Sequence, residues 1–245
     1  MLLRSISKHV REQNWFAVAL DFFIVVAGIL IAFQITNWNE KRGDDKLRVQ
    51  YLERLQSDLT QTIDYLSANE DRSRQKIEAV DVFIANLNNQ GTDENELIRT
   101  TTDYFSRGTP LFDFKVFRST FDDLTSSGKL NILGNETLST ALVTLNTNYK
   151  DMNEDNLVNT DWVLPAEAAF VMEFDWFRFD EQIIHLFPSK SPAQIVSDIR
   201  LNEDRLRRHA GLHYWMGLSL KRDFRDMIDQ SQQALNLVNE ELENR

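Results

Sequence analysis

The chain has 245 residues, with 27 basic and 38 acidic side chains and a formal net charge of −11. Such an acidic surface repels nucleic acid, so the composition argues against DNA or RNA binding. The sequence contains no cysteine, which excludes disulfide and thiolate chemistry.

The first informative segment is 15–38, WFAVALDFFIVVAGILIAFQITNW. Asp21 is the one charged residue between Trp15 and Phe33, and this run is long enough to cross a bilayer core of about 30 Å as a helix. Tryptophan stands at both ends of the segment, as is common at membrane interfaces. The sequence therefore predicts a transmembrane helix at 15–38. A basic cytoplasmic or interfacial tail (1–14) precedes it, and an acidic helical soluble domain (39–245) follows.

Basic residues on the two sides of the span bear on its orientation. Arg4, Lys8 and Arg11 favour a cytoplasmic N-terminus. The other flank is nearly as basic, but long domains cross membranes largely regardless of their charge. We therefore expect a single-pass protein of the bacterial inner membrane with a periplasmic C-terminal domain. The opposite orientation is the alternative.

One face of the predicted span combines small residues with an acid. At about 100° per residue, Ala17, Asp21, Gly28 and Ala32 lie close to one line along the helix. Gly28 and Ala32 are spaced to let a second helix approach closely, which predicts packing against a membrane partner or a second copy. Asp21 has two interpretations. It is either a polar contact near the helix start or an ion-coupling acid of a proton- or ion-driven complex.

Beyond the span, glycine and proline are scarce, which favours long helices. Apolar residues recur at intervals of three and four from Asp44 to Asn89, which predicts one amphipathic helix or two collinear ones, ended by Gly91. A second long helix is predicted over 202–243. The fold class is therefore all-α, and we expect these two long helices to be antiparallel partners in an elongated bundle.

Four shorter helices are predicted between the long ones. The first covers 94–105, and the second is marked by Phe114, Phe117, Phe121 and Leu124. A third begins after an Asn135 cap and ends before Pro165, and a fourth begins at Ser191-Pro192 and ends at Arg200. The segment 126–135 between the second and third is predicted to form a corner, with a positive φ at Gly128.

Two segments resemble the signatures of a known family. They are FQITNWNE at 33–40, directly after the span, and TFDDLTSSGKLNIL at 120–133, followed by NETL at 135–138. Both are similar to segments of a widespread, uncharacterised bacterial family of single-span, mostly helical membrane proteins. The resemblance implies a membrane-anchored helical protein and brings no activity, substrate or catalytic residue.

His209 and His213 have the i, i+4 spacing that can bind a metal ion on one helix face. No acid completes an HExxH pattern, and Arg205, Arg207 and Arg208 surround the histidines in the sequence. The sequence therefore predicts packed histidines and no metal site. The arginines are expected to pair with carboxylates of neighbouring helices.

Aromatic residues are dense in FVMEFDWFRF at 170–179. Phe170 and Phe174 share a helical face and are predicted to be core. Trp176 and Phe179 point elsewhere and are candidate partner contacts, with burial in the core as the alternative.

The sequence has no P-loop, GxGxxG, GxSxG or Cys/His cluster, so we predict no catalytic residue and no cofactor. The function expected is a non-enzymatic, membrane-anchored helical scaffold or accessory subunit of a bacterial envelope complex. The alternatives are a subunit of a proton- or ion-coupled complex that uses Asp21, and an undetected hydrolase.

Overall fold

The structure, a computed structural model, describes residues 15–111, 114–174, 176, 187 and 190–244, with side chains from Phe22 onward. These residues form helices and connecting turns, with no strand among them, so the predicted all-α fold is confirmed. The predicted tail at 1–14 lies outside the described residues. In chain order the helices are α2 (Trp15–Asn88), α3 (Glu94–Ser106), α4 (Ser119–Ser126), the short 3₁₀ helix η1 (Leu130–Leu133), α5 (Glu136–Glu173), α6 (Pro192–Leu201) and α7 (Glu203–Glu243).

The chain divides into two compact units, Met1–Gln50 and Tyr51–Arg245. The sequence placed the start of the soluble domain at residue 39, whereas the structure begins the second unit at Tyr51. Side chains of residues 39–46 are exposed on α2, and continuous burial begins with Tyr51 and Leu52. Charge and polarity rise directly after Trp38, but packing starts about three helical turns later.

The first unit contains the apolar part of α2. Its large apolar side chains are exposed within the chain, for example Phe22 at 71%, Phe23 at 70% and Phe33 at 62%. By length and composition, this is one helix that can cross a membrane. Within the described part of the first unit, these side chains form an uncovered apolar surface of the kind that marks a membrane or protein contact.

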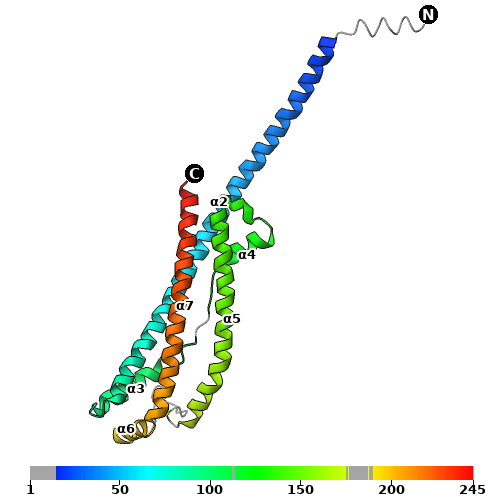
Figure 1. The fold of residues 1–245 in the computed structure, drawn as a ribbon. Coiled ribbons are helices and arrows are strands. Elements are labelled where there is room, and N and C mark those ends of the chain that lie inside the picture. Colours follow the sequence, from blue (N-terminus) through cyan, green and yellow to red (C-terminus); the bar gives the residue numbers. More distant parts are fainter. Residues whose placement is uncertain (1–14, 112–113, 175, 177–186, 188–189, 245) are drawn as a thin grey trace, which may run out of the picture. The chain divides into compact units, whose positions relative to one another are not determined.

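The second unit is a helical bundle in which α7 runs antiparallel to the part of α2 after Tyr51 (Figure 1). Three contacts define the register, and the two residue numbers of each contact add up to the same total, as a regular antiparallel pair requires. They are Gln56 with Asn239 at 2.7 Å, Glu70 with Arg225 at 2.5 Å, and Asn88 with Arg207 at 3.0 Å. The predicted antiparallel pair of long helices is confirmed.

Helix α5 packs along the other side of α7, also antiparallel, with Asn148 bonded to Gln230 and Asn135 bonded to Glu241. Its start is as predicted, because the Asn135 side chain accepts a hydrogen bond from the amide of Leu138. Its predicted end before Pro165 is wrong, since α5 continues through the proline to Glu173. An internal proline costs a helix about 3 kcal/mol. Burial of the apolar Val163 before the proline, and the hydrogen bonds of Glu167 after it, favour continuation of the helix.

The helix predicted around the four apolar residues 114–124 is shorter than expected. It begins at Ser119, and Phe114 and Phe117 lie in the extended segment before it. Asp58 of α2 decides this start, because its carboxylate accepts a hydrogen bond from the backbone amide of Thr120 at 2.9 Å. The cap comes from a residue distant in sequence, so local periodicity could not locate it. The corner after α4 has the predicted positive φ at Gly128.

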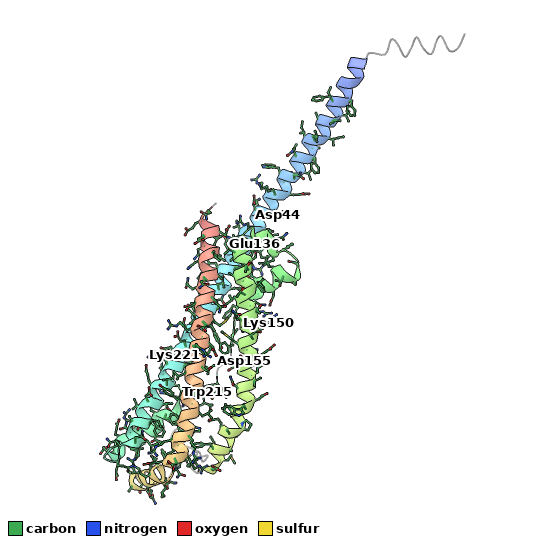
Figure 2. All side chains as sticks on the ribbon, in the orientation of Figure 1. Asp44, Glu136, Lys150, Asp155, Trp215 and Lys221 are labelled. Atoms are coloured by element: carbon green, nitrogen blue, oxygen red, sulfur yellow. The ribbon has the colours of Figure 1, made fainter. Side chains whose placement is uncertain are left out.

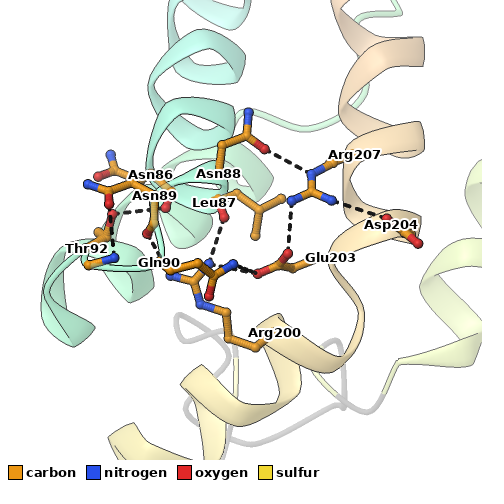
Figure 3. A network of polar contacts seen from close by, with 11 residues as sticks. Asn86, Leu87, Asn88, Asn89, Gln90, Thr92, Arg200, Glu203, Asp204 and Arg207 are labelled. Carbon is orange, nitrogen blue, oxygen red and sulfur yellow. Dashed lines mark hydrogen bonds and ion pairs between the residues drawn. The ribbon is translucent and has the colours of Figure 1, made fainter.

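A polar network closes the end of the bundle where α2, α6 and α7 meet (Figure 3). Arg200 donates hydrogen bonds to the carbonyls of Leu87 and Asn89 at 2.7 and 3.0 Å, so it satisfies carbonyls at the C-terminus of α2. Glu203 accepts from Arg200 at 2.8 Å and from Arg207 at 2.9 Å. The predicted Ser191-Pro192 start of α6 is confirmed, with a complete capping box.

Candidate functional site

A carboxylate and two imidazoles meet inside the bundle, although they are far apart in sequence. His209 and His213 lie one turn apart on α7 and share a face, and Glu167 of α5 lies opposite them. Nε2 of His213 is 2.7 Å from Oε1 of Glu167, and Nε2 of His209 is 3.2 Å from Oε2. The three side chains are only 3–10% exposed. We call Glu167, His209 and His213 the Glu–His–His cluster.

Residues of α3, of the turn after it and of α5 hold the cluster in place. Tyr104 is fully buried, and its hydroxyl lies 2.7 Å from Nδ1 of His209. Thr109 donates its hydroxyl hydrogen to Oε2 of Glu167 at 2.9 Å. The Phe170 ring stacks on the imidazole of His209, with 3.9 Å between ring centroids. The orientation of His209 is therefore set by a hydrogen bond at one ring nitrogen and by aromatic packing on its face.

Lys76 of α2 lies beside the cluster and is 3% exposed. Its Nζ donates to the carbonyl oxygen of Tyr104 at 2.8 Å and lies 4.2 Å from the centre of the Tyr104 ring. Burial lowers the pKa of Lys76 to about 7, because the charged ammonium loses its hydration. Burial likewise raises the pKa of the Tyr104 hydroxyl, so this group stays protonated.

The cluster favours a neutral His213 and an ionised Glu167. Burial lowers the pKa of His213 to about 4, although the hydrogen bond to Glu167 acts in the opposite direction. Burial also opposes ionisation of Glu167. The hydrogen bonds from His209 and His213 together outweigh that effect and keep the pKa of the carboxyl below its usual value. The ionised carboxylate of Glu167 is a group that can bind a cation.

A pocket of about 110 Å³ opens onto the cluster, lined by Lys76, Thr109, Phe170 and all three cluster residues among others. One ligand atom from each of the three cluster residues can be chosen so that all lie within 4.8 Å of one another. Two imidazole nitrogens and a carboxylate oxygen are ligands that divalent transition metals accept. The arrangement can therefore hold a cation beside a small pocket.

The sequence argument against a metal site at His209 and His213 rested on the lack of an acid in an HExxH pattern and on the three neighbouring arginines. The missing acid is Glu167, 42 residues before His209 and on another helix. Arg205 and Arg208 line a second hollow together with Glu167 and His209, but all three arginines have partners. Arg205 pairs with Glu173, Arg207 pairs with Glu203 and Asp204, and Nε of Arg208 donates to the carbonyl of Asp204. The i, i+4 histidine pair was the only available sequence signal, because helix packing alone supplies its partner.

The predicted partner contact at Trp176 is wrong. Trp176 is 1% exposed, and its ring packs against Phe174 at 4.6 Å and Phe187 at 4.8 Å between centroids. The polypeptide leaves helical geometry at Phe174, so the helical-face argument did not apply to this segment. Phe179 lies outside the described residues. Phe174 is core, as predicted.

A different aromatic pair is exposed. Trp162 of α5 and Trp215 of α7 touch edge to face, with ring centroids 6.2 Å apart, and are 62% and 51% exposed. Trp215 lies on the part of α7 beside α5, and it lines a small hollow with Asp155 (Figure 2). Val158 and Leu218, each one turn away on the same helices, are 68% and 45% exposed. We call Val158, Trp162, Trp215 and Leu218 the tryptophan patch.

The predicted packing face of the span is only partly described. Ala17 and Asp21 belong to α2, but their side chains lie outside the described part of the chain. Gly28 and Ala32 are exposed, and a β-carbon added at Gly28 would meet nothing within 4 Å. Packing through this face and ion coupling by Asp21 both stay predictions.

No family model matches the chain, and no curated protein or solved structure matches it either. The resemblance of segments 33–40 and 120–138 to an uncharacterised membrane-protein family stays a prediction. Function has to be argued from the sites described above.

Proposed function

We propose that this protein is a membrane-tethered, non-enzymatic interaction module that acts as a scaffold or accessory subunit of a bacterial envelope complex. The apolar part of α2 is its anchor in the inner membrane, and the bundle from Tyr51 onward is its partner-binding domain in the periplasm. The observation that carries the proposal is the tryptophan patch. An exposed, contacting tryptophan pair has a large apolar surface in water.

The position of the patch supports this role. Tryptophan is enriched at protein–protein hot spots, where a large rigid ring fills a partner pocket. Trp162 and Trp215 come from two different helices, so a folded bundle is needed to bring them together. Acidic residues such as Asp155 and Asp223 line the adjoining hollow, which gives the apolar centre a polar rim.

The exposed apolar side chains of α2 support the tether. In the described part of the first unit, α2 exposes large apolar side chains from Phe22 to Trp38. Arg42 lies 5.5 Å from the centre of the Trp38 ring. A cation and an amphipathic ring at this end of the apolar segment suit the interface between hydrocarbon and water.

Site-specific photo-crosslinking in intact membranes tests the proposal. A photoreactive residue at Trp215 or Leu218 is expected to capture the same discrete partner, and Trp162→Ser is expected to abolish capture from position 218. Val82 of α2, exposed to 46%, is the matched control position and is expected to capture nothing specific. Equal capture at positions 82 and 215 would contradict a dedicated interface, and so would a lack of discrete products at both 215 and 218.

The proposed orientation has its own test. A reporter active only outside the cytoplasm is fused after Arg245 and is expected to be active. A reporter active only in the cytoplasm is expected to be silent there. The reverse result would place the bundle in the cytoplasm and overturn the proposed location.

A further inference from the structure

We propose that Glu167, His209 and His213 form a binding site for one divalent transition-metal ion of the zinc class. Each residue supplies one ligand, and the adjoining pocket supplies a fourth position for water or a small ligand. The proposal concerns the interior of the bundle and is independent of the tryptophan patch. It rests on the convergence of the three side chains, on the hydrogen bonds behind them and on the cost of burying three polar side chains.

Convergence is the first argument. Both Nε2 atoms point at one carboxylate, at 2.7 and 3.2 Å. Ligands held tetrahedrally about 2.0–2.2 Å from zinc lie roughly 3.3 Å from one another. The His209 contact already has this spacing, and the His213 contact needs to lengthen by roughly 0.6 Å to reach it. The three ligand atoms lie within 4.8 Å of one another, so binding one ion requires them to draw together by up to roughly 1.5 Å.

The hydrogen bonds behind the ligands are the second argument. In the tautomer with the proton on Nε2, each imidazole donates to Glu167, and Nδ1 of His209 accepts from the Tyr104 hydroxyl. With a metal at Nε2, the proton of His209 lies on Nδ1 and is donated to the Tyr104 oxygen instead. A tyrosine hydroxyl serves in both directions, so Tyr104 orients His209 in either state. Thr109 similarly holds the second carboxylate oxygen.

The third argument is the cost of the arrangement in the absence of a ligand. Nδ1 of His213 is buried and has no hydrogen-bond partner among the described residues. A buried polar atom left in this way costs about 1–3 kcal/mol. Burying three polar side chains also costs folding free energy, and three apolar side chains of similar volume would avoid that cost. Coordination at Nε2 leaves Nδ1 of His213 without a partner, so a bound cation would offset the cost of burying the three side chains and not the cost of this atom.

The charges of the site suit a divalent cation. Metal binds to neutral imidazole and to ionised carboxylate, so in the metal-binding forms the three ligands together carry one negative charge, that of Glu167. Lys76 lines the same pocket, but its Nζ is hydrogen-bonded to the carbonyl of Tyr104. The ligand set of two imidazoles and one carboxylate leaves an open position, and that position faces the pocket of about 110 Å³.

Cobalt substitution of the full-length protein in detergent is the test. One equivalent of Co²⁺ is expected to give the visible absorption bands of a four- or five-coordinate site, and Zn²⁺ is expected to bleach them. Glu167→Gln and His213→Asn are expected to remove the bands. His9→Asn and His185→Asn, at the two other histidines of the chain, are the matched controls and are expected to retain them.

A second measurement keeps the proposal testable if those variants fail to fold. X-ray absorption of zinc-loaded wild type is expected to show two imidazole ligands and oxygen. Tyr104→Phe keeps all three ligands and is expected to weaken zinc binding 10–100-fold. Absence of cobalt bands in wild type, retention of the bands in Glu167→Gln, or a zinc spectrum without imidazole would each overturn the proposal.

Discussion

Gly217 of α7 passes so close to α2 that a β-carbon at this position would lie 2.9 Å from Cγ1 of Ile77. Real β-carbons essentially never approach another atom so closely, so the contact is available only to glycine unless something moves. The buried glycine therefore sets how near the two long antiparallel helices lie about a third of the way along α7.

Gly217→Ala is expected to destabilise the bundle by about 1–3 kcal/mol, because overpacking forces Ile77 or the helices apart. Gly211→Ala is the matched control on the same helix. Gly211 is exposed, and a β-carbon there meets nothing within 4 Å, so alanine is expected to stabilise by about 0.5–1 kcal/mol. Urea unfolding of both variants measures the two effects. A stabilising Gly217→Ala would show that the helices separate freely.

Lys76 predicts a pH dependence of stability. Its pKa is about 7 in the folded protein and about 10.5 when the side chain is in water. Between these values the unfolded chain binds a proton that the folded chain does not, so this residue makes stability rise with pH by about 1.4 kcal/mol per unit. Below pH 7 both states are protonated, and the full cost of burying the charge applies.

Lys76→Met is expected to remove this slope while it retains most of the side-chain volume. The measurement is the difference in unfolding free energy between wild type and variant at pH 7, 8 and 9. The exposed Lys115→Met is the control, and its difference from wild type is expected to be flat. A flat difference for Lys76→Met as well would mean that the buried ammonium keeps its hydration.

Arg200 predicts a local effect at the end of α2. Lysine at this position keeps the charge but cannot donate in the forked geometry that reaches both Leu87 and Asn89. Arg200→Lys is expected to cost about 1.5–3 kcal/mol and to speed hydrogen exchange of the amides in the last turn of α2. Arg222→Lys, whose partner is the adjacent Asp223, is expected to change stability by less than about 0.5 kcal/mol. Equal effects would assign no special role to the network in Figure 3.

The two interpretations of the span are separated by a pair of variants. Because a side chain at Gly28 meets nothing within the described chain, any loss of assembly in Gly28→Leu reports contact with another molecule. Under the packing interpretation Gly28→Leu disrupts the complex and Asp21→Asn does not. Under ion coupling, Asp21→Asn abolishes activity while the complex persists. Native electrophoresis with a growth phenotype measures both, and Ile31→Leu is the conservative control.

The sequence predicted local features well where the cause is local. Helix starts at Asn135 and Ser191 follow from side chains that cap their own helices. The long helices at 44–89 and 202–243 follow from sustained apolar periodicity, and their antiparallel pairing follows from length and chain order. The predictions failed at Ser119, where Asp58 of another helix provides the cap, and at Pro165, where burial of Val163 and the hydrogen bonds of Glu167 to α7 favour continuation of the helix.

The sequence by itself determined an all-α chain with one membrane-length apolar helix, because periodicity and hydropathy are properties of neighbouring residues. Only the tertiary structure decided which side chains meet. It brought Glu167 to His209 and His213, placed Trp162 against Trp215, and buried Trp176. These contacts join residues from different helices or from irregular backbone, and no local pattern specifies the rotation and register at which helices pack.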